Sequence, residues 1–327
     1  MQYFHVLTMV DGIAAVELAS LLLDAEPDPE HPPASDDWQP AREPAPADLL
    51  GGGIGQRVKE AASLASVPLR LARSPARLLD LPAAALRTGR TLARAALPLA
   101  PDSPLNVPSS PHRHLARLSR PLDDLRHVKR HFDTTVNDVL LASCAGGVRA
   151  FLSGRGDEPT DLKAMVPVNV RTEDDRQAGN RISFLFVDLP CAEPDPLERL
   201  ARIHAHVSGR RSDADPERAD AALKAIELAP RPVQRIVSQA AASPRLFNLV
   251  VSNVPGPRIP LWMLGCRLQE AYPVVPLAEE HALSIGMTTV GDQACFGLYA
   301  DSETLPDADL LAEQIGVAID ELVELAA

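Results

Sequence analysis

The 327-residue sequence has few cysteines, few basic residues and no long apolar run, and each shortage excludes a class of protein. Its four cysteines include no C-x-x-C pair, so neither a zinc knuckle nor a disulfide scaffold is indicated, and reduced thiols in the cytoplasm are expected. There is no apolar run of about 18 residues and no basic N-terminal stretch, so the sequence shows neither a membrane-spanning helix nor a signal peptide. Lys and Arg number 32 against 44 acidic residues, and the net charge of −12 argues against nucleic acid as a partner.

The charged residues that are present occur in blocks. Residues 1–55 carry ten acidic residues and one basic residue, whereas residues 56–100 carry eight basic and two acidic residues. Residues 25–50 are rich in Pro, Asp and Glu, which predicts a flexible linker. Residues 51–102, rich in Ala, Leu and Arg, are predicted to form short amphipathic helices. This basic segment either lies on an anionic membrane surface or packs as a solvated helical connection, and both interpretations stay open.

The spacing of apolar residues predicts alternating strands and helices. The firmest element is a hairpin around Gly291-Asp292, because Gly at the first position of a two-residue loop suits a type II′ turn. The predicted architecture is α/β, with a mixed, largely antiparallel sheet and helices over one face. The expected strands are 2–10, 113–119, 163–170, 182–188, 246–252, 266–275, 281–290 and 293–300, and the expected helices are 11–23, 121–131, 136–153, 196–210, 215–240 and 306–325.

Most candidate motifs for chemistry fail on spacing. The glycines of residues 51–55 do not form G-x-G-x-x-G, and the sequence contains no Walker loop and no G-x-S-x-G elbow. Several histidine pairs have metal-like spacings but lack a Glu or a third ligand, so we interpret them as surface or packing residues and predict no metal site. These pairs are His127 and His131, His112 and His114, and His204 and His206.

A strand-to-helix junction near the N-terminus remains as a candidate site. Gly12 permits a tight turn, and Asp11 is suited to cap the following helix or to hold a neighbouring group by an ion pair. Taken alone, this pattern is typical of a turn.

Seven segments in succession resemble bacterial wax ester synthase/diacylglycerol acyltransferases. The resemblance implies the fold of coenzyme-A-dependent acyltransferases and condensation domains, in which two similar α/β halves face each other across a tunnel. It divides the chain into a remnant of the N-terminal half (1–24), the linker, the basic crossover and a C-terminal domain (103–327). The N-terminal half is expected to be incomplete, through either a misplaced start or a natural truncation. The segments are VDGIAAVELASLLLD, SPLNVPSSPHR, TVNDVLLASCAGGVRAFL, MVPVNVR, GNRISFLFVDLP, LVVSNVPGPRIPLWMLGCRLQEAYPVVPL and LSIGMTTVGDQACFGLYAD.

The family motif H-H-x-x-x-D-G aligns with Asp11, whose implied role is structural. The two histidines would then fall at positions 6 and 7, where this sequence has Val6 and Leu7. His5 lies about 6.5 Å farther along a strand than the expected base, so it is either a displaced catalytic base or an ordinary strand residue.

Two further sites follow from the resemblance. Asn137 and Asp138 match the family's Asn-Asp pair, although Asn137 is equally suited to cap the following helix. The SNVPGP segment, with Asn253 and Gly256, matches a loop whose backbone donors could meet a substrate oxygen, the alternative being a plain turn.

The resemblance implies an O-acyltransferase that moves a fatty acyl group from acyl-CoA, its co-substrate, to diacylglycerol or a long-chain alcohol, with no cofactor. Because the motif histidines are absent, we expect this chain to be impaired. The alternatives are a non-catalytic remnant or lipid-associated partner protein and, less favoured, a condensation-type domain. We expect a cytoplasmic protein in peripheral contact with the inner membrane surface or lipid bodies, and self-association through the open half-tunnel.

Overall fold

The computed structural model describes residues 22–29, 39, 45, 99–169, 182–213, 243–257 and 259–327. The chain divides into two compact units, of which Met1–Pro29 with Ala96–Ala327 is one and Glu30–Ala95 is the other. The predicted strand 2–10 and helix 215–240 lie outside the described residues, as does the predicted helix 11–23 apart from its last two positions. No described helix combines the length and the apolar character that a membrane span requires.

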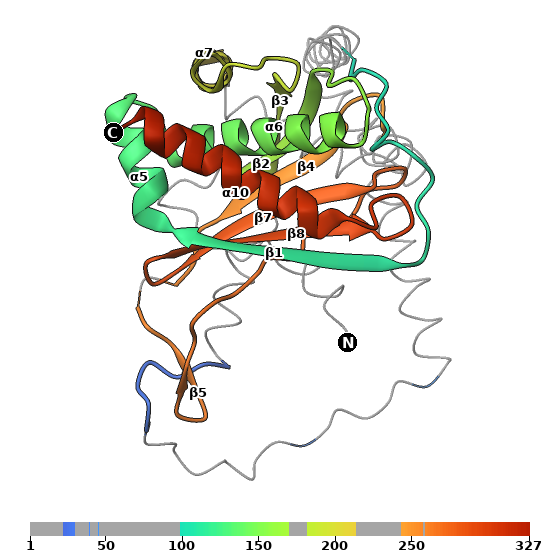
Figure 1. The fold of residues 1–327 in the computed structure, drawn as a ribbon. Helices are drawn as coiled ribbons and strands as arrows, with labels where there is room; N and C mark the ends of the chain where they lie inside the picture. Colours follow the sequence, from blue (N-terminus) through green and yellow to red (C-terminus); the bar gives the residue numbers. More distant parts are fainter. Residues whose placement is uncertain are drawn as a thin grey trace, which may run out of the picture. The chain divides into compact units, whose positions relative to one another are not determined.

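A six-stranded sheet forms the centre of the first unit, in the order β1-β8-β7-β4-β2-β3 (Figure 1). Neighbouring strands are antiparallel in the pairs β1–β8, β7–β8 and β2–β3 and parallel in β4–β7 and β2–β4. The sheet is therefore mixed and largely antiparallel, which confirms the predicted fold class. The strands are β1 (Arg113–Pro121), β2 (Leu162–Asn169), β3 (Ile182–Leu189), β4 (Leu249–Val254), β7 (Leu283–Val290) and β8 (Gln293–Asp301).

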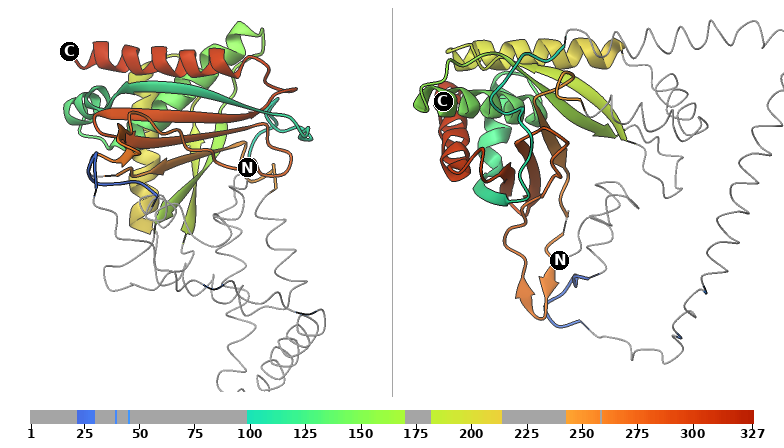
Figure 2. Two further views of the ribbon diagram at one scale, coloured as in Figure 1. Left: turned by 90° about the horizontal axis from the view of Figure 1, so that it is seen from below. Right: turned by 90° about the vertical axis from the view of Figure 1, so that its right-hand side faces the viewer.

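The four described helices lie together on one side of this sheet, as the two views of Figure 2 show. α6 and α10 pack closely because Gly147 leaves no room for a side chain, since a Cβ there would lie 2.7 Å from the backbone nitrogen of Ile315. The predicted helices agree with the observed ones to within three residues. They are α5 (Leu122–His131), α6 (Val136–Gly154), α7 (Pro196–Asp213) and α10 (Ala308–Leu325).

The two faces of the central strands carry different side chains. Ile285 and Met287 of β7 belong to the apolar core that the helices cover. Gly286 lies between them and therefore faces the opposite side, where it pairs with Gly297 of β8. A Cβ on Gly286 would lie 3.0 Å from the Pro273 side chain, so the chain around Pro273 crosses this second face in close contact.

This crossing corrects the prediction of a strand over residues 266–275. Only Cys266–Arg267 forms a strand, β6, and it pairs with Trp262–Met263, β5, in a separate two-stranded sheet. Pro273 and Val275, which follow in the sequence, pack against the six-stranded sheet at Gly286 and do not form a strand of it. The predicted strand 246–252 also begins too early, because residues 244–246 form a turn before β4.

The β7–β8 hairpin has the predicted two-residue loop, since Val290 pairs with Gln293 across Gly291 and Asp292. Gly291 has a φ of 59°, and Asp292 is outside the left-handed region. This is the φ pattern of a type II′ turn.

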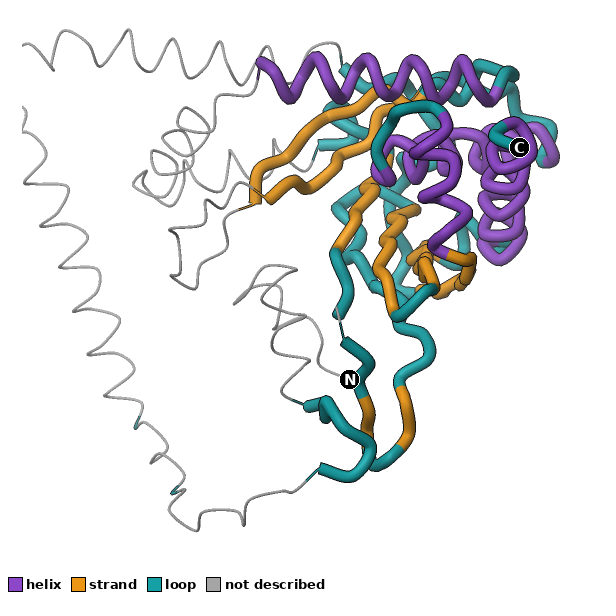
Figure 3. The backbone as a smooth tube through the Cα atoms, turned by 90° about the vertical axis from the view of Figure 1, so that its left-hand side faces the viewer, coloured by secondary structure: helices purple, strands orange, loops and turns teal. Residues whose placement is uncertain are grey.

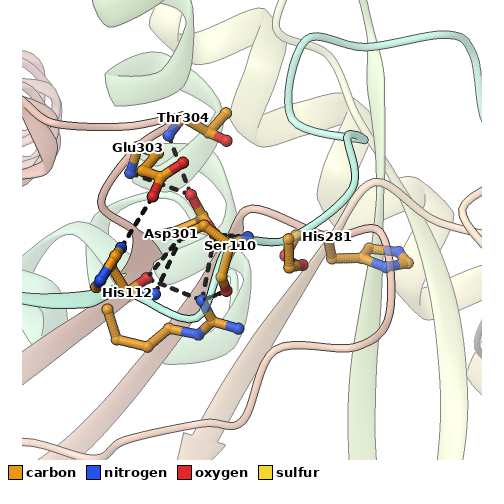
Figure 4. Close-up of polar contacts among 8 residues, drawn as sticks. Ser110, His112, His281, Asp301, Glu303 and Thr304 are labelled. Atoms are coloured by element: carbon orange, nitrogen blue, oxygen red, sulfur yellow. Dashed lines mark hydrogen bonds and ion pairs between the residues drawn. The ribbon is translucent and has the colours of Figure 1, made fainter.

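A buried carboxylate joins the start of β1 to the end of β8 (Figure 4). The Asp301 side chain is fully buried, and its Oδ2 accepts hydrogen bonds from the Ser110 backbone N–H at 2.6 Å and from Arg113 Nη1 at 3.2 Å. Its Oδ1 accepts from the backbone N–H groups of Glu303 and Thr304, each at 3.1 Å. Burial by itself raises the pKa of this carboxyl, but the hydrogen bonds outweigh burial and hold the pKa below its ordinary value.

The β5–β6 hairpin lies at the end of two long connections, away from the six-stranded sheet (Figure 3). Its two-residue turn, Leu264-Gly265, has positive φ at both positions, which is the type I′ pattern. On its other edge β5 meets the N-terminal segment, where the backbone groups of Asp24 and Trp262 exchange two hydrogen bonds of 2.8 Å.

Candidate functional site

The first turn of α6 is held by a reciprocal pair of hydrogen bonds. Thr135 is the N-cap, and its Oγ1 accepts from the Asp138 backbone N–H at 3.1 Å. The Asp138 Oδ2 accepts from the Thr135 backbone N–H at 2.9 Å, which completes a capping box. The cap is therefore Thr135, and the prediction that Asn137 caps the helix is wrong. Asn137 lies inside the first turn with its side chain half-buried, and it has no hydrogen-bond partner among the described residues.

The Asp138 carboxylate also reaches a second helix. Its Oδ2 lies 2.9 Å from His204 Nδ1 of α7. Asp138 is 1% exposed, whereas the His204 side chain is 40% exposed. The pair fixes one ring nitrogen of His204 against Asp138 and ties the start of α6 to α7. The sequence predicts only a surface or packing role for His204, and it does not indicate this partner 66 positions away.

Asn253 lies near the end of β4, on the side of the sheet that the helices cover. Leu249 and Val251 of the same strand belong to the core under the helices, and alternate residues of a strand share a face. Asn253 is half-buried, one residue before β4 ends and the loop begins.

The N-terminus of α6 and the end of β4 lie at the same edge of the sheet (Figure 1). Near the other end of α6, Arg149 donates to the carbonyl groups of Cys191 and Ala192, directly after β3. β3 ends beside the start of β2, and β2 runs parallel to β4. α6 therefore runs antiparallel to β4, and the fold brings the Asn137 and Asn253 segments to one edge.

The SNVPGP loop continues from β4 along the β7–β8 hairpin. The Gly256 N–H donates to Thr289 Oγ1 at 3.3 Å, and a Cβ on Gly256 would overlap the Thr289 carbonyl group. Only glycine fits here, because the backbone of the loop touches the backbone of β7. The Gly256 N–H is thus used within the protein, and the substrate-binding role expected of this loop stays a prediction.

A cleft of about 400 Å³ opens beside this loop. The charged residue that lines the cleft is Arg126 of α5, and Gly256 and Thr289 line it as well. The cleft is open to solvent at the edge and is lined further by Leu122, Pro255, Pro257, Ile259, Pro260 and Gly291.

Two cysteines near α6 and α7 are poor nucleophiles. Burial raises the pKa of the Cys191 thiol to about 12, with a further contribution from the Asp161 charge. Burial also raises the pKa of Cys144 far above its ordinary value. Thiolate chemistry at these two positions is therefore disfavoured at neutral pH.

At this edge of the sheet, the Asn137 side chain has no hydrogen-bond partner among the described residues. The amide N–H group of Asn137 is suited to stabilise negative charge on a carbonyl oxygen. His5 and Asp11 lie outside the described residues, so their predicted roles stay predictions. The Thr-x-x-Asp spacing of the capping box was visible in the sequence and would have identified Thr135.

The chain matches two family models that together cover most of its length. The WS/DGAT C-terminal domain matches residues 178–323, and the wax ester synthase/diacylglycerol acyltransferase catalytic domain matches residues 3–140. A Mycobacterium tuberculosis H37Rv protein, provisionally named a diacylglycerol O-acyltransferase, is 32% identical over 96% of this chain and 68% of its own length. The chain belongs to the wax ester synthase/diacylglycerol acyltransferase family.

Other members of this acyltransferase family agree with that assignment. A second M. tuberculosis H37Rv protein with the same provisional name is 33% identical over 97% of this chain and 62% of its own length. The solved wax ester synthase/diacylglycerol acyltransferase from Marinobacter aquaeolei VT8 is 26% identical, with a TM-score of 0.61 over 97% of this chain and 66% of that structure. The chain therefore spans 62% to 68% of the length of these relatives.

Proposed function

We propose that this chain forms the C-terminal body and part of the active-site edge of an O-acyltransferase that acts on acyl-CoA and on diacylglycerol or a long-chain alcohol. The observation that carries the proposal is that the Asn137-Asp138 and Asn253–Gly256 segments lie toward the same edge of the sheet, in a chain that matches both family domains. The division into 1–24, 25–50, 51–102 and 103–327 is part of this proposal.

The reaction would place the acyl thioester at this edge. The alcohol oxygen attacks the thioester carbonyl carbon, the carbon–sulfur bond breaks, and the alcohol proton passes to a base and then to the leaving thiolate. Asn137 would donate to the carbonyl oxygen as negative charge develops there. The Asp138 contacts with Thr135 and His204 would hold the turn that carries Asn137.

The base is the missing part of this arrangement. General-base assistance contributes about 10²- to 10⁴-fold in rate. Val6 and Leu7 occupy the positions of the motif histidines, and neither side chain accepts a proton. We therefore propose that the chain binds acyl-CoA but transfers its acyl group slowly, with His5 as the candidate residual base and Asp11 in a structural role.

Palmitoyl-CoA carrying a labelled acyl chain tests both parts of the proposal. Binding is measured by calorimetry, and transfer by counting labelled neutral lipid after incubation with diacylglycerol or hexadecanol. Counting lipid is preferable to trapping the released thiol, because the exposed Cys266 would react with the trapping reagent. The Marinobacter aquaeolei relative serves as the positive control.

We expect saturable binding and turnover at least about 100-fold below that of the control. An absence of acyl-CoA binding would refute the proposed function. Turnover equal to the control would refute the impairment, and turnover abolished by His5→Ala would identify His5 as the base.

A second candidate is a non-catalytic, lipid-associated protein of the same family. The apolar residues at positions 6 and 7 favour it, since they remove the expected base. Under this hypothesis the Val6→His/Leu7→His variant stays as inactive as the native chain, whereas an impaired enzyme gains turnover. Location in the cytoplasm against the inner membrane surface or lipid bodies belongs to both candidates.

A further inference from the structure

The contact between His204 and Asp138 has the geometry of a general base and the carboxylate that orients it. The Asp138 Oδ2, which lies 2.9 Å from His204 Nδ1, also accepts from the Thr135 backbone N–H. This oxygen is therefore the acceptor, and His204 Nδ1 carries the donated proton. In the neutral ring the lone pair is then on Nε2, which has no hydrogen-bond partner among the described residues. A histidine held in this way is suited to take a proton at Nε2.

The Asp138 carboxylate is placed to support the ring as it gains that proton. Its Oδ1 is buried and has no hydrogen-bond partner among the described residues. The donors that the described part of the chain offers to this carboxylate are the Thr135 N–H and the His204 ring, both at Oδ2. Because water does not screen a buried carboxylate, it attracts positive charge on its neighbour strongly. Proton uptake at Nε2 is thus stabilised from the opposite side of the ring.

Burial of the carboxylate distinguishes His204 from the other described histidines. His112, His114 and His206 also lie beside carboxylates, but those side chains are 47% to 67% exposed. His114 is the nearest match to His204, since its side chain is 39% exposed and its Nε2 lies 2.8 Å from an Asp309 oxygen. Water competes for that exposed carboxylate, so His114 is held less firmly.

The His204–Asp138 pair lies toward the edge of the sheet that carries Asn137. Near the end of α6, Arg149 donates to the Ala192 carbonyl group just before α7 begins, whereas Asp138 near the start of α6 meets His204 in the middle of α7. α7 therefore runs antiparallel to α6 and packs along it. Since Asn137 and Asp138 are consecutive in the first turn of α6, the candidate carbonyl donor and the candidate base come to the same end of that helix.

We propose that the His204–Asp138 pair gives the chain a further activity, the hydrolysis of acyl-CoA to a fatty acid and coenzyme A. The nucleophile is water, because the His204 side chain is 40% exposed and solvent reaches it. The step does not use positions 6 and 7, where the family's motif histidines are replaced by Val6 and Leu7. This inference rests on the proposed function, since the acyl thioester has to lie at this edge.

The reaction needs no reactant other than water and acyl-CoA. His204 Nε2 takes a proton from water as the water oxygen bonds to the thioester carbonyl carbon, and the Asn137 amide donates to the carbonyl oxygen. The tetrahedral intermediate then collapses, the carbon–sulfur bond breaks, and the proton on Nε2 passes to the leaving thiolate. Asp138 is a positioning residue that holds the ring during both proton transfers.

Palmitoyl-CoA labelled in the acyl chain is the probe, incubated with the 327-residue protein in the absence of any alcohol. Released palmitate is counted after extraction, and acyl-CoA binding is measured separately by calorimetry. His204→Ala removes the base, and Ala is readily accommodated in a helix. His114→Ala is the matched control, because it removes a histidine of nearly equal exposure beside an exposed carboxylate. Circular dichroism verifies that both variants are folded.

We expect the native chain and both variants to bind palmitoyl-CoA equally, and His204→Ala to release palmitate about 100-fold more slowly than His114→Ala. Imidazole added to the buffer should restore about tenfold in His204→Ala and change nothing in the control, because a free base can enter the space that the ring leaves. A structural role for His204 would not respond to imidazole.

Three results would overturn the inference while the proposed function stands, each in a protein that binds palmitoyl-CoA. They are no palmitate release by the native chain above the protein-free rate, equal release by His204→Ala and His114→Ala, and a loss in His204→Ala that imidazole does not restore. An absence of palmitoyl-CoA binding would instead refute the proposed function, and the inference with it.

Discussion

Replacing Asp301 with Asn tests how far one buried carboxylate holds the body together. The substitution keeps the size of the side chain but converts one of its two acceptor oxygens into an NH₂ group. Oδ2 faces the N–H groups of Ser110 and Arg113, and Oδ1 faces those of Glu303 and Thr304. Whichever way the Asn amide is turned, its NH₂ group takes the place of one oxygen and faces two N–H groups, so three donors meet without an acceptor.

The expected loss follows from these contacts. A hydrogen bond to a charged group contributes about 1.5–3 kcal/mol, and a buried donor without an acceptor costs about 1–3 kcal/mol. Relaxation and the remaining oxygen recover part of this, so we expect Asp301→Asn to lower the free energy of unfolding by about 3 kcal/mol. For a body of roughly 200 residues this corresponds to a fall in Tm of about 6–12 °C.

The loss depends on pH with a definite sign. The pKa of Asp301 in the folded protein is lowered from 3.8, so its contribution is present above the unfolded value and is lost as the pH falls through the folded value. The difference in stability between native protein and Asp301→Asn should therefore be constant from pH 7 to about pH 5 and shrink below about pH 4.

Urea denaturation followed by circular dichroism at several pH values measures this difference. Glu303→Gln is the control, because its exposed side chain pairs with the exposed His112, and we expect a change below about 0.5 kcal/mol. A loss below about 1 kcal/mol for Asp301→Asn at pH 7, or a difference that grows on acidification, would refute the reasoning.

Three further predictions concern other parts of the chain. In a double-mutant cycle, His204→Ala and Asp138→Asn should show a coupling of about 1 kcal/mol in unfolding free energy, and additive losses would contradict the contact. Gly256→Ala should destabilise the protein by about 1–3 kcal/mol through overlap with β7, whereas Gly154→Ala, with open space around it, should be neutral, so equal melting temperatures would argue against the loop geometry. Residues 56–100, of which 56–98 lie outside the described residues, should bind anionic vesicles with about 1 kcal/mol per basic residue near the surface, and co-sedimentation that ignores salt or survives their deletion would count against this.

Local chemistry in the sequence was enough for most elements of the fold. The loop Gly291-Asp292 specified its hairpin, because glycine alone accepts the left-handed backbone at little cost there. Alternating apolar residues placed β7 and β8, and the long apolar pattern after Thr135 placed α6. Such features depend on neighbours a few positions apart, so periodicity and turn chemistry determine them.

Other features depend on contacts between distant residues, and only tertiary packing decided them. Residues after Cys266 have the composition of a strand, yet the facing Gly286 and Gly297 open a space on the sheet that Pro273 fills from outside. The resemblance assigned Asn137 to a family position, but the sequence did not show where it lies. Asn137 lies at the same edge of the sheet as Asn253 because α6 runs antiparallel to β4. The Asp138–His204 contact joins residues 66 positions apart, and a single side chain carries no record of the partner that folding brings to it.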